Sequence, residues 1–240
     1  ADGSLTIALI DVTGHGVAAA LAVNRLHGEL KRALAQNPDA EPAAVITALN
    51  EYIHLTLADE QVFATAVALR ARPDGAVSLC IAGHPPPLLR RLDGTISALD
   101  STAAMLGMLG PQEFDAESTD VVLAPGELLV LYTDGAIEAQ DRGGKQLGIA
   151  GVRRLVAGLG SPEPDHAVAT ILEHKARFDP LGKMPKQVSS PQPMSQMDAL
   201  AEAVPPALRT LRAFAAVDVV TVLKRGEKPV NWVGLVDELP

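Results

Sequence analysis

Aromatic side chains are scarce in this sequence, at 3% of its residues. A hydrophobic core must therefore be aliphatic, and there is ample material for one, because 48% of the residues are hydrophobic. The single cysteine, Cys80, excludes an intramolecular disulfide and is typical of a reducing compartment. Because Cys80 lies in an apolar strand pattern, we expect a buried structural thiol rather than a nucleophile.

Long apolar runs and clusters of basic residues are also missing. No run reaches the roughly 18 residues that a membrane span needs, and no signal peptide is recognisable, so we expect a cytoplasmic protein. The net charge of −9 and the absence of a Lys/Arg cluster argue against nucleic acid as a partner and against a nuclease. A phosphorylated partner remains compatible with this charge if bound metal ions supply local positive charge.

The first residues indicate a piece of a longer protein. Ala1-Asp2-Gly3-Ser4 is typical of a hairpin turn, and a hairpin turn needs a strand before it. We therefore expect an N-terminally truncated domain.

Hydrophobic periodicity predicts a strand, two helices, a series of antiparallel strands, further helices and a last strand. That order favours an α+β fold with helices packed on antiparallel sheets. Three pairs of strands are expected to form hairpins, across Pro73-Asp74-Gly75, Asp93-Gly94 and Ala124-Pro125-Gly126. We expect one domain over residues 1–226, with a long loop at 180–206 that holds a short helix near 196–203, and a C-terminal tail at 227–240. The predicted strands are 5–12, 61–72, 76–82, 88–92, 95–99, 121–123, 127–133 and 217–223, and the predicted helices are 17–36, 41–57, 148–159 and 165–178.

Three aspartates stand in apolar strand surroundings: Asp11, Asp134 and Asp218. A carboxylate in such a place costs several kcal/mol unless it is paired or neutralised. One interpretation is that each caps a helix or a turn, as Asp134 before Gly135 would. The other is that the strand ends converge and the carboxylates share Mg²⁺ or Mn²⁺, which prefer oxygen ligands.

The segment Gly14-His15-Gly16 follows the first of these aspartates. Its glycines would allow the backbone to approach a metal or a phosphate closely, and the helix predicted from Val17 would direct its positive N-terminus there. His15 would be placed to protonate a leaving alkoxide. The alternative for His15 is a surface or capping residue.

Three longer motifs occur in order: residues 10–20 (IDVTGHGVAAA), 82–89 (AGHPPPLL) and 131–139 (LYTDGAIEA). Together they closely resemble the bacterial PPM-type (protein phosphatase 2C-like) phosphatases of the stage II sporulation protein E class. The resemblance covers most of residues 5–176, with the strand at 217–223 as its last element. It implies two packed antiparallel sheets flanked by helices, an αββα sandwich.

The resemblance also implies a chemistry. Members of this class hydrolyse phosphoserine or phosphothreonine on proteins with two Mn²⁺ or Mg²⁺ ions, by direct attack of a metal-bound water. By motif, Asp11 resembles the ligand that bridges both ions, and the carbonyl of Val12 resembles a further ligand. Asp134 resembles a ligand of one ion, and Asp218 resembles the usual metal ligand of the last strand. His15 resembles a general acid. For the His84 motif we expect a structural role.

Two departures from the family pattern matter. The family's Gly-Asp-x-x-Asp motif, on the strands before Asp11, is not in this chain. The last strand usually opens with two aspartates, whereas here Val219 follows Asp218. A lost acid can weaken an outer metal site, so the alternative function is a catalytically weak partner-switch module that binds a regulatory phosphoprotein without turnover.

In this class the phosphatase domain usually follows a sensor or receiver domain, and its substrate is usually a small phosphorylated anti-anti-sigma protein. The resemblance thus implies signal transduction that regulates a sigma factor, and a homodimer remains open. Because the helices predicted at 17–36 and 41–57 directly follow Asp11, we expect them to couple regulation to metal binding.

Overall fold

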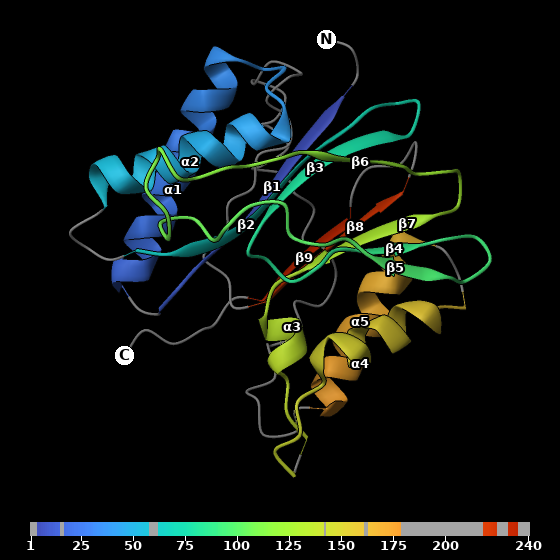
Figure 1. Ribbon diagram of the computed structural model, residues 1–240. Helices are drawn as coiled ribbons and strands as arrows, with labels where there is room; N and C mark the ends of the chain where they lie inside the picture. Colours follow the sequence, from blue (N-terminus) through green and yellow to red (C-terminus); the bar gives the residue numbers. More distant parts are fainter. Residues whose placement is uncertain are drawn as a thin grey trace, which may run out of the picture. The chain divides into compact units, whose positions relative to one another are not determined.

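The chain forms two compact units that alternate along the sequence, each built around one antiparallel sheet (Figure 1). The computed structural model describes residues 4–14, 17–57, 62–141, 143–160, 163–178, 218–224 and 230–234. Unit 1 contains the described residues of Ala1–His84 and Ser101–Val122. Unit 2 contains those of Pro85–Asp100, Leu123–Gln187 and Ala216–Pro240. The antiparallel sheets and their helices confirm the predicted α+β class.

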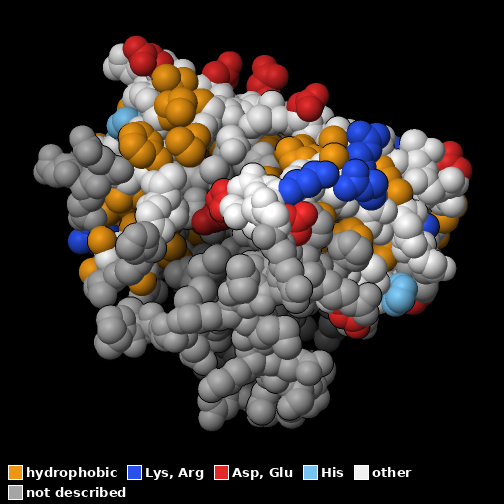
Figure 2. Space-filling model, turned by 90° about the horizontal axis from the view of Figure 1, so that it is seen from below, with side chains coloured by type: hydrophobic (Ala, Val, Ile, Leu, Met, Phe, Trp, Pro, Cys, Tyr) orange, Lys and Arg blue, Asp and Glu red, His pale blue; other side chains and the backbone are white. Residues whose placement is uncertain are grey.

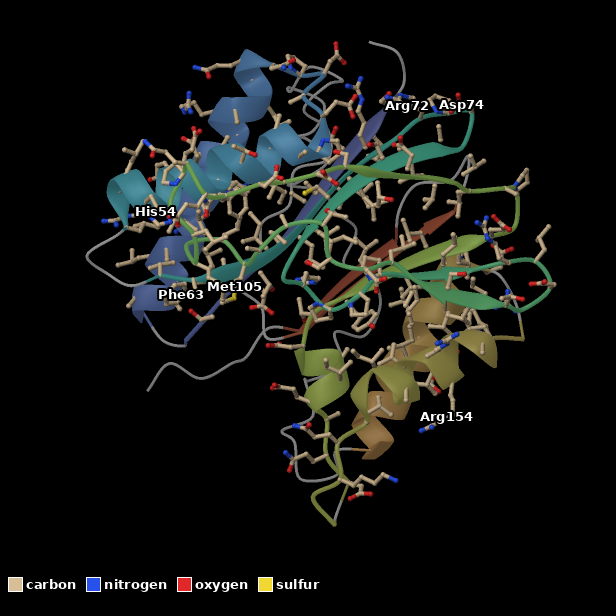
Figure 3. The ribbon with its side chains drawn as sticks, viewed as in Figure 1. His54, Phe63, Arg72, Asp74, Met105 and Arg154 are labelled. Atoms are coloured by element: carbon tan, nitrogen blue, oxygen red, sulfur yellow. The ribbon has the colours of Figure 1, made fainter. Side chains whose placement is uncertain are left out.

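The sheet of unit 1 has four strands in the order β1-β2-β3-β6. β1 pairs with β2 along its whole length, so that Leu5 lies opposite Ala71 and Val12 opposite Ala64. The predicted turn between β2 and β3 is confirmed: Asp74 accepts a hydrogen bond from the backbone N–H of Ala76, and Asp74 lies at the tip of this hairpin in Figure 3. The four strands are β1 (Leu5–Val12), β2 (Ala64–Ala71), β3 (Ala76–Ala82) and β6 (Thr119–Val122).

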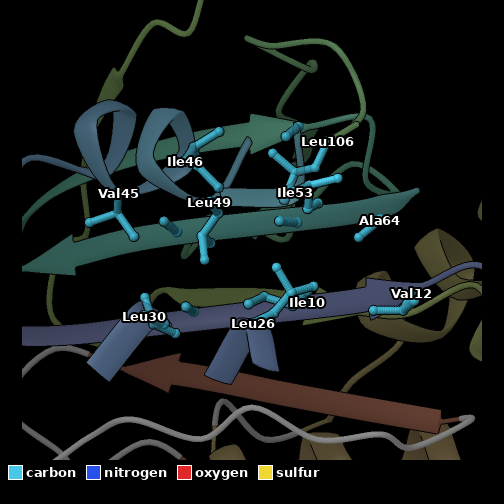
Figure 4. Close-up of a cluster of buried hydrophobic side chains, with 14 of the residues drawn as sticks. Ile10, Val12, Leu26, Leu30, Val45, Ile46, Leu49, Ile53, Ala64 and Leu106 are labelled. Carbon is cyan, nitrogen blue, oxygen red and sulfur yellow. The ribbon is translucent and has the colours of Figure 1, made fainter. Parts of the chain in front are cut away.

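Helices α1 (Val17–Gln36) and α2 (Pro42–Thr56) cover one face of this sheet, as their periodicity predicts. Their apolar residues recur three or four positions apart, which places them along one side of each helix. This side packs on the alternate residues of β1 and β2 that point the same way (Figure 4). The buried cluster includes Ala8, Ile10, Val12, Leu26, Leu30, Leu34, Val45, Ile46, Leu49, Ile53, Ala64, Ala66 and Ala68.

The sheet of unit 2 has five strands in the order β5-β4-β7-β8-β9. Every residue of β7 is buried, which confirms that this wholly apolar strand is covered on both faces. Three helices, α3 (Gly135–Glu138), α4 (Gly148–Ala157) and α5 (Pro164–Phe178), contribute to a second aliphatic cluster with β4 and β7. The strands are β4 (Leu88–Arg90), β5 (Ile96–Ala98), β7 (Leu128–Tyr132), β8 (Asp218–Lys224) and β9 (Val230–Gly234).

One predicted hairpin is wrong. A turn does form at Ala124-Pro125-Gly126, where the backbone N–H of Glu127 donates to the carbonyl of Ala124. The strands on its two sides do not pair, however, because β6 pairs with β3 and β7 pairs with β4 and β8. Turn residues signal a reversal of the chain, but they do not decide whether the flanking strands become neighbours.

The segment 227–240, predicted as a tail, contains strand β9. β9 pairs antiparallel with β8, so that Asp218 lies opposite Gly234 and Val222 lies opposite Val230. It is only five residues long, too short for its alternation to stand out in the sequence. The division into a domain at 1–226 and a tail stays a prediction, and the turn at Ala1–Ser4 and the loop at 180–206 lie mostly or wholly outside the described residues.

Two predictions about composition can be compared with the described part of the chain. Cys80 is fully buried, and burial raises the pKa of its thiol, as expected for a structural cysteine. Among the described helices, none is long and apolar enough to span a membrane. The face drawn in Figure 2 carries one small group of Lys and Arg side chains, with Asp and Glu side chains beside it.

Candidate metal centre

Asp11 lies at the end of β1, on the sheet face away from α1 and α2. Its neighbours Ile10 and Val12 belong to the cluster beneath the helices, so alternation along the strand places Asp11 on the opposite face. Its register partner there is Thr65 of β2. Asp11 is half-buried, which leaves part of it accessible at the strand end.

The chain leaves β1 through a tightly held turn. Thr13 donates two hydrogen bonds to the carbonyl of Phe63, from its backbone N–H at 2.9 Å and from its hydroxyl at 3.0 Å. Phe63, labelled in Figure 3, directly precedes β2. Gly14 follows with a φ of +97°, a left-handed conformation that a residue with a side chain rarely adopts. The backbone around Asp11 and Val12 is thus anchored on both strands.

Of the two remaining candidate residues in this segment, the structure describes Val12 but not His15. The Val12 side chain is hydrocarbon and is buried in the cluster of unit 1, so the candidate ligand of this residue is its backbone carbonyl. His15 lies outside the described residues, and its role as a general acid stays a prediction. The N-terminus of the 20-residue helix α1 follows at Val17, as predicted.

In unit 2, Asp134 follows β7 and Asp218 begins β8, the strand that pairs with β7. β7 and β8 are antiparallel, with Tyr132 opposite Val220. Continuing this register by two residues beyond Tyr132 reaches Asp134 on one side and Asp218 on the other. The buried Thr133 separates Asp134 from the strand, and Asp134 itself is exposed.

The Asp134 carboxylate does not cap a helix. Asp134 precedes α3, but its side chain makes no capping hydrogen bond, and its own backbone carbonyl accepts the N–H groups of Ile137 and Glu138. Asp93 and Asp141, by contrast, accept backbone N–H groups within their own turns. In Asp93 the hydrogen bonds from Thr95 lower the pKa of the carboxyl group. The capping interpretation of Asp134 is therefore wrong, and its carboxylate is available to a cation.

His84, in the second motif, is buried with 4% of its surface exposed. Its Nδ1 lies 2.8 Å from the hydroxyl oxygen of Thr65, the register partner of Asp11. Sequence reasoning did not identify Thr65, because its place opposite Asp11 follows from the pairing of β1 with β2. The only available signal was that pairing, and a register shift of one residue would have moved Thr65 to the other face.

The donor set fits a hard divalent cation in its chemistry. Carboxylate and carbonyl oxygens are the ligands that Mg²⁺ and Mn²⁺ prefer, and Asp134 is exposed with its carboxylate unused by the helix. In the part of the chain that the structure describes, no three His, Cys, Asp or Glu side chains are grouped closely enough to hold a metal ion. Asp11 belongs to unit 1, and Asp134 and Asp218 belong to unit 2.

Comparison with known proteins decides the family. The family model of stage II sporulation protein E (SpoIIE) matches residues 1–184. The chain belongs to the SpoIIE family. This match includes Asp11, His15, His84 and Asp134, and the family expected from the three motifs is confirmed.

Two curated relatives from Bacillus subtilis (strain 168) align with the chain. Phosphoserine phosphatase RsbP is 33% identical over 136 residues, which are 55% of this chain and 33% of RsbP. Phosphoserine phosphatase RsbU is 28% identical over 145 residues, which are 59% of this chain and 41% of RsbU. The aligned region thus spans less than half the length of each of these relatives.

A solved structure shares the fold of this SpoIIE-family chain. The SiaA-PP2C domain of Pseudomonas aeruginosa superposes with a TM-score of 0.62 at 19% sequence identity, covering 78% of this chain and 77% of that domain. The fold is therefore that of the PP2C phosphatases, as predicted.

Proposed function

We propose that this SpoIIE-family chain is the catalytic part of a metal-dependent protein serine/threonine phosphatase. Its substrate would be a phosphorylated regulator protein, of the anti-anti-sigma type that the family resemblance implies. The observation that carries the proposal is the placement of the acidic residues. Asp11 is the next-to-last residue of β1, Asp134 follows β7 by two residues, and Asp218 begins β8, which pairs with β7. Membership of a family with named phosphoserine phosphatases among the relatives supports it.

Four groups would hold two Mn²⁺ or Mg²⁺ ions: the carboxylates of Asp11, Asp134 and Asp218 and the carbonyl of Val12. When bound, such ions polarise a phosphoryl group and lower the pKa of a coordinated water, so that hydroxide is available near neutral pH. Because Asp11, Asp134 and Asp218 lie at or next to the ends of strands, the strands would fix the positions of the carboxylates that hold the ions. His15 would donate a proton to the serine or threonine oxygen that leaves the phosphorus.

The phosphatase proposal is tested with the full-length protein, a phosphoserine protein and Mn²⁺. We expect Asp134→Asn to lower kcat by about 100-fold or more, because one metal ligand is lost. We expect little change in thermal stability, because Asp134 is exposed and caps no helix. The measurement is phosphate release, with and without EDTA.

Asp141→Asn is the matched control. This substitution makes the same chemical change, from aspartate to asparagine, at a turn where Asp141 accepts the backbone N–H groups of Gly143 and Lys145. We expect phosphatase activity close to that of the wild type. Full activity in Asp134→Asn, or hydrolysis by the wild type that is insensitive to EDTA, would contradict the proposal.

The second candidate function is a partner-switch module that binds a phosphoprotein without hydrolysing it. The observation in its favour is Val219, which follows Asp218 in β8 and is the register partner of Val233. By the family resemblance, a second aspartate is usual at position 219. Tight binding of a phosphoprotein without metal dependence and without phosphate release would favour this module over the phosphatase.

A further inference from the structure

The Gly83-His84-Pro85 segment contains a buried histidine to which the proposed chemistry assigns no task. Only 4% of the His84 surface is exposed. A buried imidazole needs a hydrogen-bond partner, and Nδ1 of His84 has one in the hydroxyl of Thr65 at 2.8 Å. This side-chain pair joins the segment that follows β3 to β2.

Thr65 in turn lies directly across from Asp11. The two residues are register partners in the antiparallel pairing of β1 with β2. Directly opposed residues on such a pair lie on the same face, with their Cβ atoms about 4.5–5.5 Å apart. Asp11, Thr65 and His84 thus follow one another from the edge strand β1 inward, on the face away from the helices.

The backbone holds His84 rigidly from both sides. Gly83 has a φ of +59°, and its N–H donates to the carbonyl of Ala103 and the hydroxyl of Ser101. A Cβ added at Gly83 would lie 2.9 Å from the Cβ of Met105, so glycine is needed there. Pro85 restricts the backbone of His84 to extended conformations. The backbone therefore holds the imidazole of His84 in a fixed position next to Thr65.

We propose that Thr65 and His84 are positioning residues for Asp11, with His84 acting through the Thr65 hydroxyl. A hydroxyl can donate one hydrogen bond and accept others. Because the hydrogen bond to the imidazole fixes the rotation of the Thr65 side chain, the Thr65 hydroxyl keeps one orientation on the face that Asp11 shares. The pair thereby orders the strand end that would hold the bridging metal ligand, so this inference rests on the proposed function.

Paired substitutions separate this role from simple core packing. Thr65→Val and His84→Leu remove the hydrogen bond while keeping similar bulk. Thr65→Ser keeps the hydroxyl, and His84→Asn keeps a nitrogen close to the position of Nδ1. Thr102→Val is the control, because the Thr102 hydroxyl accepts the backbone N–H of Ile81, which pairs with Val67 rather than with Thr65.

The first readout is the dissociation constant for Mn²⁺, measured by calorimetric titration of the full-length protein. We expect Thr65→Val and His84→Leu each to weaken Mn²⁺ binding about tenfold, the usual size of the effect for groups that orient a metal ligand. The double variant should be no weaker than either single one, because both changes break the same hydrogen bond. Thr65→Ser, His84→Asn and Thr102→Val should stay within about threefold of the wild type.

The second readout needs no metal. Amide hydrogen exchange at residues 11–13 of the metal-free protein should be faster in Thr65→Val and His84→Leu and unchanged in Thr102→Val. If the variants lower thermal stability but leave both Mn²⁺ affinity and this exchange as in the wild type, the positioning role is overturned.

The two proposals fail in different ways. Absence of Mn²⁺ binding in the wild type would refute the phosphatase proposal. Hydrogen exchange would then still decide whether Thr65 and His84 order the end of β1, because that measurement does not depend on the metal.

Discussion

Val219 stands in β8 at the position where the family resemblance leads us to expect a second aspartate. It is the second residue of β8 and follows the candidate ligand Asp218. The two proposed functions differ in what this valine means. In a phosphatase it would reduce the affinity of an outer metal ion, whereas in a partner-switch module it would mark a site without turnover.

Restoring the acid at this position tests that difference. We expect Val219→Asp to tighten Mn²⁺ binding and to lower the Mn²⁺ concentration for half-maximal phosphatase activity by about tenfold. Val219→Asn, which has nearly the same shape without the charge, should leave both values unchanged. An equal effect of the two variants would show that charge at position 219 is not the cause.

Tyr132 at the end of β7 makes stability sensitive to alkaline pH. It is fully buried in the cluster of unit 2, and burial raises its pKa from 10.0 to about 12. In the unfolded chain the phenol ionises at its ordinary pKa, whereas in the folded chain it stays neutral to higher pH. The contribution of Tyr132 to stability is therefore complete below pH 10 and is lost as the pH rises toward about 12.

The variant Tyr132→Phe should remove this sensitivity. We expect its free energy of unfolding, measured in urea at several pH values, to fall less than that of the wild type between pH 10 and about 12. Tyr52→Phe on α2, a residue that is only partly buried, serves as the control. Parallel pH profiles for wild type and Tyr132→Phe would contradict the prediction.

At the scale of elements, β1 and α1 share one buried cluster. Ile10 and Val12 flank Asp11 in the sequence, and both belong to the same cluster as Leu26 and Leu30 of α1 (Figure 4). A displacement of α1 would therefore act on the backbone that carries Asp11 and the Val12 carbonyl. This packing is the physical basis for the expectation that these helices couple regulation to metal binding.

The variant Leu26→Ala should change both stability and metal binding. We expect a loss of about 2–5 kcal/mol in the free energy of unfolding, as for other large-to-small core changes, together with several-fold weaker Mn²⁺ binding. Val156→Ala, in the α4 part of the other cluster, should lower stability without this loss of affinity. If Leu26→Ala alters stability alone, the coupling between α1 and the metal site is refuted.

At the scale of the whole molecule, metal binding should be coupled to folding. Asp11 belongs to unit 1, and Asp134 and Asp218 belong to unit 2. Metal ions held by these residues would bind only the folded chain, so they should stabilise it by mass action. That stabilisation is about 2.7 kcal/mol when the free metal concentration is about 100 times the dissociation constant.

Thermal unfolding with Mn²⁺ and with EDTA measures this effect in the full-length protein. We expect a higher Tm with Mn²⁺ for the wild type, and loss of that difference in both Asp11→Asn and Asp134→Asn. Asp93→Asn, at the β4–β5 turn, should keep the difference. A Tm difference that survives in Asp11→Asn or in Asp134→Asn would show that the replaced residue does not hold the metal.

Local pattern was enough to predict much of this protein. The extent of α1, the hairpin between β2 and β3, the buried β7 and the order of Asp11, Asp134 and Asp218 were all evident before the fold. The three motifs also predicted the family. Each of these features depends on residues close in the chain: helical or strand periodicity, turn residues and contiguous motifs.

Only the tertiary structure decided which strands become neighbours and what each side chain meets. β6 pairs with β3 rather than β7, β9 completes the second sheet, and Asp134 leaves its helix uncapped. The bond between Thr65 and His84 joins residues 19 positions apart. Strand pairing is chosen by competition among distant segments for shared core surface, and this choice leaves no local signal in the sequence.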